Sequence, residues 1–289
     1  MASPPSPCHL LVLLARQGDA AVIIRRGPAG WTRLITWNTR TDVFEAGQWF
    51  RGAFYERRCD LSPSGDKLIY FVAKHHLGKV DPSYTSAWTA ISKPPYLTAL
   101  GLWPNAGTTY HGGGLFDAED VVSINSVDHR WSNPERDAAA HVHPKHTPPR
   151  GVRVRSIAFT SGDQLFAKRL ARDGWTLVEG GPVDQDMAAT SGRFVREVGD
   201  QKLELAFGYH QADYTLSEKK KGRWSKVPID GMTWADWDRR GRFVFAKDGS
   251  LYALRRTQVA DLHEVDMLAS FNDQKPSRVM TPAHAKVWR

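Results

Sequence analysis

The chain has few cysteines, and this scarcity excludes two ways of stabilising a fold. Only Cys8 and Cys59 are present among its 289 residues. Two thiols cannot cross-link a domain of this size, and the sequence contains neither a CxxC pair nor the Cys/His spacing of a structural zinc site. Low cysteine content fits a reducing compartment.

Long apolar runs are also absent. The run from Leu10 to Ala15 is short, no Lys or Arg precedes it, and Arg16 and Asp19 follow at once, which is unlike a secretory signal. No window approaches the roughly 20 apolar residues of a membrane span. Nucleotide-binding and kinase motifs are missing as well. We therefore expect a cytoplasmic protein with no membrane contact and no cofactor.

What the sequence does contain is a succession of short β-rich runs separated by turn residues. The first three are Leu10–Leu14, Ala20–Ile24 and Trp31–Trp37, and Gly-, Pro- and Asp-containing connections join them. The runs are rich in β-branched or aromatic residues, which suits half-buried strands. This pattern predicts an antiparallel meander.

The same strand–turn–strand pattern returns along the chain. Its clearest copy is Cys59–Phe71, and further copies are Ile157–Ala167, Trp234–Ala246, Gly114–Ile124 and Ala189–Val195. A related unit, in which a Trp follows the turn, occurs in Arg26–Ile35, Arg169–Val178 and Ser217–Val227. Repetition at roughly 40–50 residues is typical of a β-propeller, whose blades have about four strands each. We interpret most of the Trp residues as packing at sheet edges.

The predicted fold is therefore all-β. We expect residues 1–289 to form a single β-propeller of about five or six four-stranded antiparallel blades. An irregular segment rich in His and Pro interrupts the pattern near residues 127–150. Only Val259–Ala269 has the composition of a helix.

One copy of the pattern resembles a known repeat family. The segment Leu61-Ser62-Pro63-Ser64-Gly65-Asp66-Lys67-Leu68-Ile69-Tyr70 is similar to the TolB-type, WD40-like propeller repeat, which runs roughly SPDG(K/R)xLxY. Ser64 stands where the family usually has Asp, and Trp237–Phe245 is a more distant copy. The resemblance covers about one turn and two strands. It implies a propeller-like fold and no particular activity, because propellers serve as scaffolds, sensors and enzymes.

The stretch from Trp88 to Phe116 combines many aromatic residues with Pro and Gly and carries little charge. Loops on a rigid β scaffold often hold binding residues. We therefore predict a recognition surface made of four side chains: Tyr96, Trp103, Tyr110 and His111. The alternative is that these aromatic residues fill the space between blades.

A second candidate site is a cluster of histidines. His141, His143 and His146 have an HxHxxH spacing, and residues two apart on an extended chain face the same side. They are the predicted metal ligands, to which Asp137 or Glu135 would add a carboxylate. The alternative is an exposed Pro-rich loop.

Two other motifs are explained by turns. The segment His111–Gly114 resembles an oxyanion loop of α/β-hydrolases, but the chain has no G-x-S-x-G nucleophile motif. We expect its glycines to form a tight loop instead. The segment Asp236–Gly241 resembles a calcium loop, but Arg240 and Lys247 stand where oxygen ligands belong.

The formal net charge of +8 favours anionic partners. The only tight cationic run is Lys219–Lys221, followed by Gly222-Arg223-Trp224, and we interpret it as a solvated turn. Three functions stay open. The first is a non-catalytic binding module or scaffold for a protein partner. The second is a propeller hydrolase, metal-assisted if the histidines hold a metal. The third is binding of nucleic acid or another polyanion.

Overall fold

The computed structural model describes residues 7–27, 30–74, 84–105, 109, 111–125, 142–157, 161–180, 191–208, 212–255 and 264–289. The chain divides into two compact units. Unit 1 comprises Met1–Val12, Arg25–Pro28 and Ala167–Lys275, and unit 2 comprises Leu13–Ile24, Ala29–Phe166 and Pro276–Arg289. The prediction of one domain over the whole chain stays a prediction.

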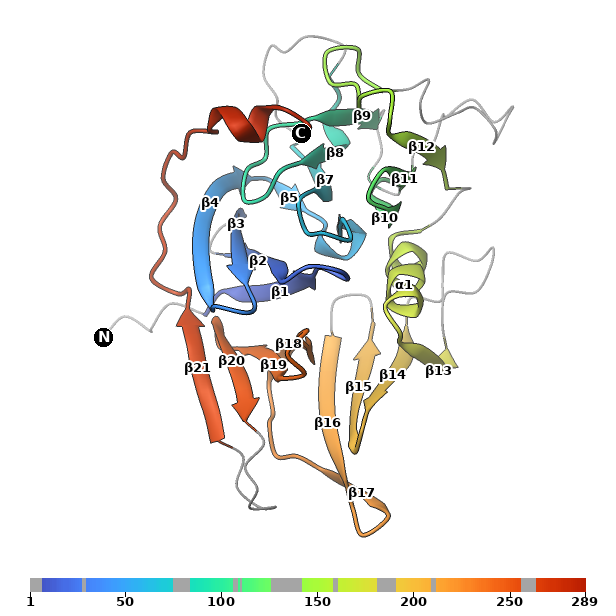
Figure 1. Ribbon diagram of the computed structural model, residues 1–289, viewed down its shortest axis with the longest axis vertical. Coiled ribbons are helices and arrows are strands. Elements are labelled where there is room, and N and C mark those ends of the chain that lie inside the picture. The colour runs from blue at the N-terminus through green and yellow to red at the C-terminus, as the bar shows by residue number, and fades with distance from the viewer. Residues whose placement is uncertain are drawn as a thin grey trace. The chain divides into compact units, whose positions relative to one another are not determined.

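The described residues are mostly strands, arranged in five sheets whose strands follow one another in sequence (Figure 1). The first sheet has the order β1 (His9–Leu14), β2 (Ala20–Arg26), β3 (Trp31–Asn38) and β4 (Val43–Arg51). The second has β5 (Ala53–Phe54), β7 (Leu68–Ala73), β8 (Ala87–Ser92) and β9 (Gly101–Asn105), with β6 (Asp60–Leu61) paired to β7. The third has β10 (Gly114–Ala118), β11 (Val121–Ile124) and β12 (Arg153–Ser156). Strand β12 pairs parallel with β11, so the prediction of four antiparallel strands is wrong for this sheet.

Unit 1 contains the remaining two sheets. The fourth sheet has β13 (Thr176–Gly180), β14 (Gly192–Val198), β15 (Gln201–Phe207), β16 (Ala212–Lys220) and β17 (Arg223–Lys226). The fifth has β18 (Met232–Trp237), β19 (Phe243–Lys247), β20 (Ser250–Arg255) and β21 (Glu264–Ser270). Each of these sheets is an antiparallel meander. The all-β class and the modular succession of strands are therefore confirmed.

Several strand pairs form where the turn residues in the sequence predicted them. In the segment that resembles the propeller repeat, Leu61 pairs with Leu68 across a turn. The backbone N–H of Ser62 donates to Lys67 (2.8 Å), and Gly65 supplies the positive φ of 90° that the turn needs. The predicted pairs of β10 with β11 and of β18 with β19 also form.

Two segments expected to be strands form a helix instead. Helix α1 spans Gly162–Arg172 and takes the place of the second strand predicted in Ile157–Ala167 and the first strand predicted in Arg169–Val178. The strand predicted after the Asp-Gly turn does form, as β13. Ser161 and Gln164 cap it reciprocally, because each backbone N–H bonds the other's side-chain oxygen, at 2.8 and 3.2 Å. Residues Leu165, Phe166 and Leu170 are buried at helical spacing. The Ser-Gly-Asp sequence is thus a helix start and not a hairpin turn.

The helix predicted over Val259–Ala269 is also wrong for the part that the structure describes. Residues Glu264–Ser270 form strand β21, which pairs antiparallel with β20. Val265 lies opposite Leu254, and Met267 lies opposite Tyr252. Pairing with an available neighbour outweighs the helical composition of so short a segment.

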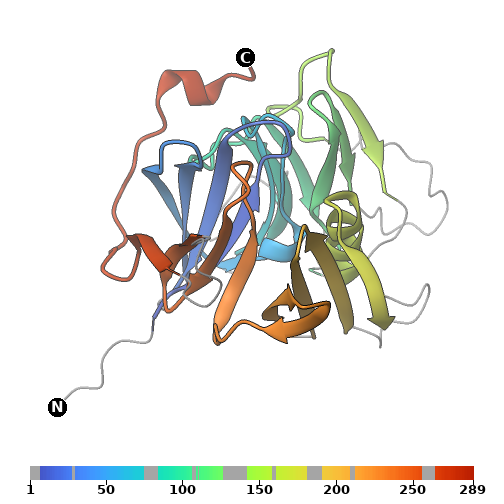
Figure 2. The same ribbon diagram turned by 60° about the horizontal axis from the view of Figure 1, so that its bottom comes forward.

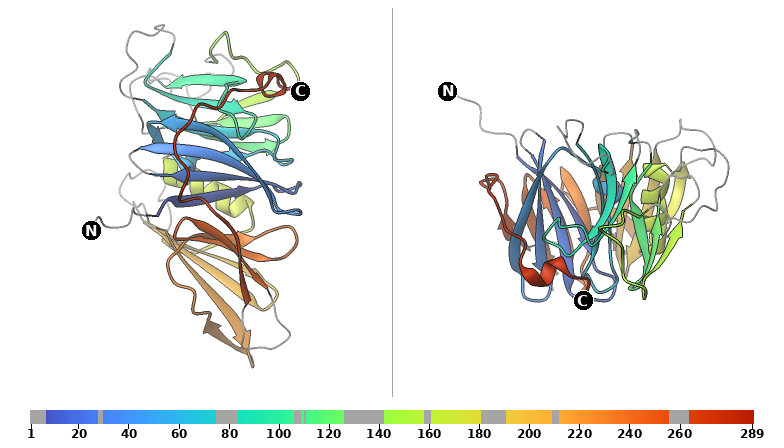
Figure 3. Two further views of the ribbon diagram at one scale, coloured as in Figure 1. Left: turned by 90° about the vertical axis from the view of Figure 1, so that its left-hand side faces the viewer. Right: turned by 90° about the horizontal axis from the view of Figure 1, so that it is seen from above.

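Unit 2 packs around β7, all six residues of which are buried. One core cluster joins Ile69 on β7 to side chains of the strands around it. The segment after Lys275, drawn in red in Figure 3, is held by this unit: the side-chain amide of Gln48 donates to the carbonyl of Val279 (2.9 Å), and Trp288 packs against the cluster. This segment completes the cover of the core.

Unit 1 joins its N-terminal residues to the end of its last sheet. The buried guanidinium of Arg25 on β2 donates to the carbonyl oxygens of Phe271 (3.0 Å), Asn272 (3.2 Å) and Gln274 (3.5 Å). The backbone N–H of Cys8 donates to the side-chain oxygen of Asn272 (3.0 Å). Among the described residues, no helix is long and apolar enough to span a membrane.

Candidate functional site

The structure places Trp103 inside the core of unit 2. Its side chain is 1% exposed and belongs to the cluster with Ile69, Ile91 and Phe116. A partner could not contact this indole without opening the sheet. Trp103 is a packing residue here, as the alternative interpretation of the aromatic stretch supposed.

The other predicted recognition residues do not form one exposed surface within the described chain. His111 is 7% exposed, and its carbonyl accepts hydrogen bonds from Arg58 (3.2 Å) and Asn105 (2.9 Å). Tyr96 is half-buried and donates to the carboxylate of Glu45 (2.9 Å); burial and that carboxylate raise the pKa of Tyr96. Tyr110 lies outside the described residues.

The backbone of the glycines after His111 lies close against Phe71 and Arg58. Gly112 has φ 118°, and a Cβ there would lie 2.2 Å from a ring carbon of Phe71. Gly113 has φ 89°, and a Cβ there would lie 2.3 Å from the carbonyl oxygen of Arg58. The expected tight loop is confirmed, and its glycines are required by both backbone conformation and space.

Two of the three predicted metal ligands lie together. The rings of His143 and His146 are 5.3 Å apart, and Tyr84 stacks on His143 at 4.3 Å. Nδ1 of His146 lies 3.2 Å from the carbonyl of Ala99, which can only accept; this nitrogen therefore carries the proton, and Nε2 accepts from the Tyr84 hydroxyl (3.0 Å). A metal on His146 would have to displace one of these contacts.

His141 lies outside the described residues, so the complete HxHxxH set stays a prediction. Within the ranges that the structure describes, no three His, Cys, Asp or Glu side chains are grouped closely enough to hold a metal ion.

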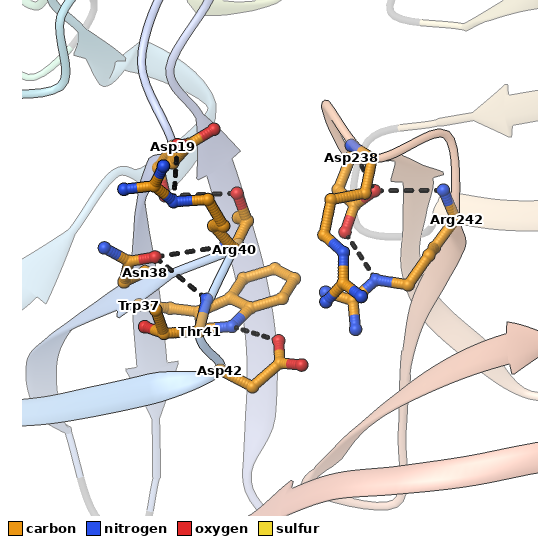
Figure 4. A network of polar contacts seen from close by, with 10 residues as sticks. Asp19, Trp37, Asn38, Arg40, Thr41, Asp42, Asp238 and Arg242 are labelled. Carbon is orange, nitrogen blue, oxygen red and sulfur yellow. Dashed lines mark hydrogen bonds and ion pairs between the residues drawn. The ribbon is translucent and has the colours of Figure 1, made fainter.

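In the turn that resembles a calcium loop, donors of the turn itself hydrogen-bond the Asp238 carboxylate (Figure 4). Oδ1 of Asp238 accepts from the backbone N–H groups of Arg240 and Arg242, both at 2.9 Å. Its Oδ2 accepts from the Arg242 guanidinium (2.8 Å). The buried carboxylate caps this turn, in the way Asp commonly does.

The hairpin that joins β16 to β17, drawn in orange in Figure 2, has a group of mostly exposed cations near Trp224. We call it the Trp224 patch, and its members are Lys202, Lys219, Lys220, Lys221, Arg223, Trp224 and Lys226. Lys221 (φ 50°) and Gly222 (φ 78°) form the tight turn that the sequence predicted. Trp224 is 38% exposed, whereas the equivalent Trp175 is 5% exposed.

Strand pairing puts the centre of the patch on one side of the sheet. Trp224 lies directly opposite Lys219, and Lys226 and Lys202 lie opposite Ser217 on its two sides. Residues directly opposite each other, and residues two apart along a strand, share a face. Lys202, Lys219, Trp224 and Lys226 therefore project together. Lys220 and Arg223, which pair with each other beside the turn, project to the other face. Leu203, Leu205 and Leu216 are buried on that other face.

Lysine ammonium groups of the patch interact both with the indole ring and with carboxylates. Nζ of Lys202 lies 5.2 Å from the Trp224 ring centroid, and Nζ of Lys219 lies 5.9 Å from it, both within range of a cation–π interaction. Lys202 also pairs with Glu204 (2.6 Å), and Lys226 pairs with Asp230 (3.1 Å). Glu197 lies directly opposite Lys202 on the same face. The six cations of the patch still outnumber these three carboxylates.

Comparison with known proteins adds no family to this description. No protein family model matches the chain, and no curated protein matches it. Among solved structures, it is similar to the crystal structure of the GH43 BlXynB protein from Bacillus licheniformis, with a TM-score of 0.35 and 9% identity. The match covers 94% of this chain and 56% of that chain, so this chain spans little more than half of its length. A likeness this weak supports no inference about function.

Unit 1 also contains a half-buried acid with a shifted pKa. Asp236 on β18 contacts the guanidinium of Arg196 at 2.5 Å and accepts from the backbone N–H of Trp237 (2.8 Å). Burial raises the pKa of Asp236 to about 6, although Arg196 opposes that shift. Such a group can exchange a proton near neutral pH. The hydrolase hypothesis stays a prediction.

Sequence reasoning missed the Trp224 patch because it assigned Trp residues after hairpin turns to packing. A local signal was available. The strand Arg223–Lys226 has a charged or hydroxyl residue at every position except Trp224, so the indole has no apolar neighbour along its own strand.

Proposed function

We propose that this protein is a non-catalytic binding module of the β-propeller type, and that it binds a polyanion at the Trp224 patch. The observation that carries the proposal is the clustering of exposed Lys and Arg around an exposed indole on one hairpin. This arrangement fits an anionic ligand by charge complementarity. The protein-partner hypothesis depended on the aromatic stretch, in which Trp103 and His111 are buried.

The propeller part of the proposal has two supports. The sheets follow one another in sequence, and the fourth and fifth are antiparallel meanders. In addition, the N-terminal residues of unit 1 bond the end of the last sheet through Arg25 and Cys8, and a closed ring of blades needs a contact of that kind.

The first experiment is a salt titration of binding. A short duplex DNA and heparin serve as polyanions, and affinity is measured by fluorescence anisotropy and by competition. Lys219, Lys221 and Lys226 are exposed. If each contacts one phosphate, log K falls with log salt at a slope of about −3 for DNA. Affinity should then drop by about 50-fold between 50 and 200 mM salt.

Charge reversal then tests the location. We expect the double variant Lys219→Glu, Lys226→Glu to lose most of the affinity and to flatten the salt slope by about 2, since two cations are removed. The control is Arg150→Glu, Arg153→Glu, which changes the net charge equally at exposed positions outside this sheet. Equal losses in the two variants, or no binding to either polyanion at low salt, would refute the proposal.

A further inference from the structure

We infer that the ligand of the Trp224 patch is a single-stranded nucleic acid, one base of which stacks on the indole. This inference rests on the proposed function and adds to it the class of polyanion. The structural observation is that the indole stays 38% exposed on a strand whose other residues are Arg, Ser and Lys.

The position of Trp224 is costly unless the ring has a use. An exposed indole leaves a large apolar surface in water, and β17 offers it no apolar partner in sequence. The opposite face of the sheet already has its core residues, Leu203, Leu205 and Leu216. The patch thus presents an aromatic surface to the solvent together with its cations.

An aromatic face selects among polyanions. Every nucleobase has a π face that can stack on an indole, and such stacking is worth about 1–3 kcal/mol per base. Sulfated polysaccharides have no bases. In a duplex, the bases are already stacked on one another. Of these ligands, only an unpaired strand offers both a base to Trp224 and phosphates to the lysines around it.

A base can stack on Trp224 only if it displaces an ammonium group from the ring, and the positions of Lys202 and Lys219 allow this displacement. Lys202 is 20% exposed and tied to Glu204, so it supports the indole from a fixed position. Lys219 is exposed and lies directly opposite Trp224. A base that takes the place of the Lys219 ammonium on the ring leaves that ammonium beside the adjoining phosphate, where a charge-assisted contact replaces the cation–π contact.

The test compares ligands that differ in the availability of bases. Oligothymidylate and oligouridylate provide unpaired DNA and RNA, while duplex DNA and heparin provide the same kind of charge without accessible bases. We expect Trp224→Ala to weaken binding of the unpaired strands by about 5- to 150-fold, the factor that corresponds to the stacking energy. Binding of the duplex and of heparin should change less than two-fold, within about 0.4 kcal/mol.

Two further variants make the result specific. Trp224→Phe retains an aromatic face and should keep most of the affinity for unpaired strands. Val198→Ala removes exposed apolar surface from the neighbouring hairpin of the same sheet and should have no effect on any ligand. Circular dichroism and urea unfolding confirm that each variant is folded.

The outcomes separate the two proposals. If Trp224→Ala leaves affinity for the unpaired strands unchanged while Lys219→Glu, Lys226→Glu lowers it, the patch binds polyanions by charge alone and the inference of stacking is overturned. Equal affinity of wild-type protein for heparin and for unpaired strands of matched charge would overturn it as well. If the wild-type protein binds none of these ligands at low salt, the proposed function itself is refuted.

Discussion

The buried Arg25 provides a sharp test of how unit 1 is held together. Its side chain is 1% exposed, and it donates to backbone carbonyls of Phe271, Asn272 and Gln274, as well as to that of Gly27. These acceptors follow strand β21, so the guanidinium links the second strand of the chain to the end of the last one. We expect Arg25→Met to break this link.

The magnitude follows from the contacts. A hydrogen bond from a charged donor contributes about 1.5–3 kcal/mol, and a buried acceptor left without its donor costs about 1–3 kcal/mol. The contacts to Phe271 and Asn272 are the shorter of the three, at 3.0 and 3.2 Å. Methionine recovers part of the loss, because it does not bring a charge into the interior. We expect a net loss of about 3 kcal/mol.

Urea unfolding followed by tryptophan fluorescence measures this loss. With an m-value of about 2–3 kcal/mol/M, the midpoint should fall by roughly 1 M. Arg26→Met is the matched control, because Arg26 is the next residue on β2 and is exposed. Arg25→Lys keeps the charge but not the planar fork, so it should fall between the control and Arg25→Met. A loss below about 1 kcal/mol for Arg25→Met, or one equal to the control, would refute the reasoning.

Two further predictions concern a titrating acid and a glycine. Burial raises the pKa of Asp236 to about 6, so the folded state holds this proton more tightly than the unfolded state. The protonated carboxyl therefore stabilises the folded protein fully below about pH 4. This stabilisation, roughly 2–3 kcal/mol, is lost as the pH rises through 6. Asp236→Asn should remove that dependence, and parallel profiles of unfolding free energy for the two proteins between pH 4 and 7 would contradict it. Gly112→Ala should destabilise the protein by more than about 2 kcal/mol, because Cβ would overlap the Phe71 ring at a positive φ. Gly151→Ala, where nothing lies within 4 Å, is the control, and similar thermal midpoints for the two variants would show that the loop tolerates a side chain.

Local turn chemistry explains which parts of the fold could be predicted from the sequence. The pair of β6 with β7 and the pair of β18 with β19 are each joined by a turn whose Gly, Pro and Asp residues fix the connection within a few positions. Helix α1 was not predicted, because Ser161-Gly162-Asp163 is compatible with both a turn and the start of a helix. The capping residue Gln164 was the signal that would have separated the two.

The candidate sites were harder to predict, because exposure depends on which strands pair. Trp103 follows Leu100, Gly101 and Leu102, whereas Trp224 lies between Arg223 and Ser225. Pairing with β8 places the first in a core cluster, whereas the second lies on a terminal strand of the fourth sheet and stays exposed. The composition of each strand indicates this difference, but the contacts that bury Trp103 join segments far apart along the chain and cannot be predicted from it.

The contact between Arg25 and Phe271 spans 246 positions of sequence, and this separation has a consequence for biosynthesis. A ribosome makes the acceptor carbonyls long after the guanidinium has left the exit tunnel. Until then, the first strands carry a cation whose native partners do not yet exist. Nascent chains stalled before Phe271 should therefore be digested readily by protease at the N-terminal strands, and the protein released from the ribosome should resist.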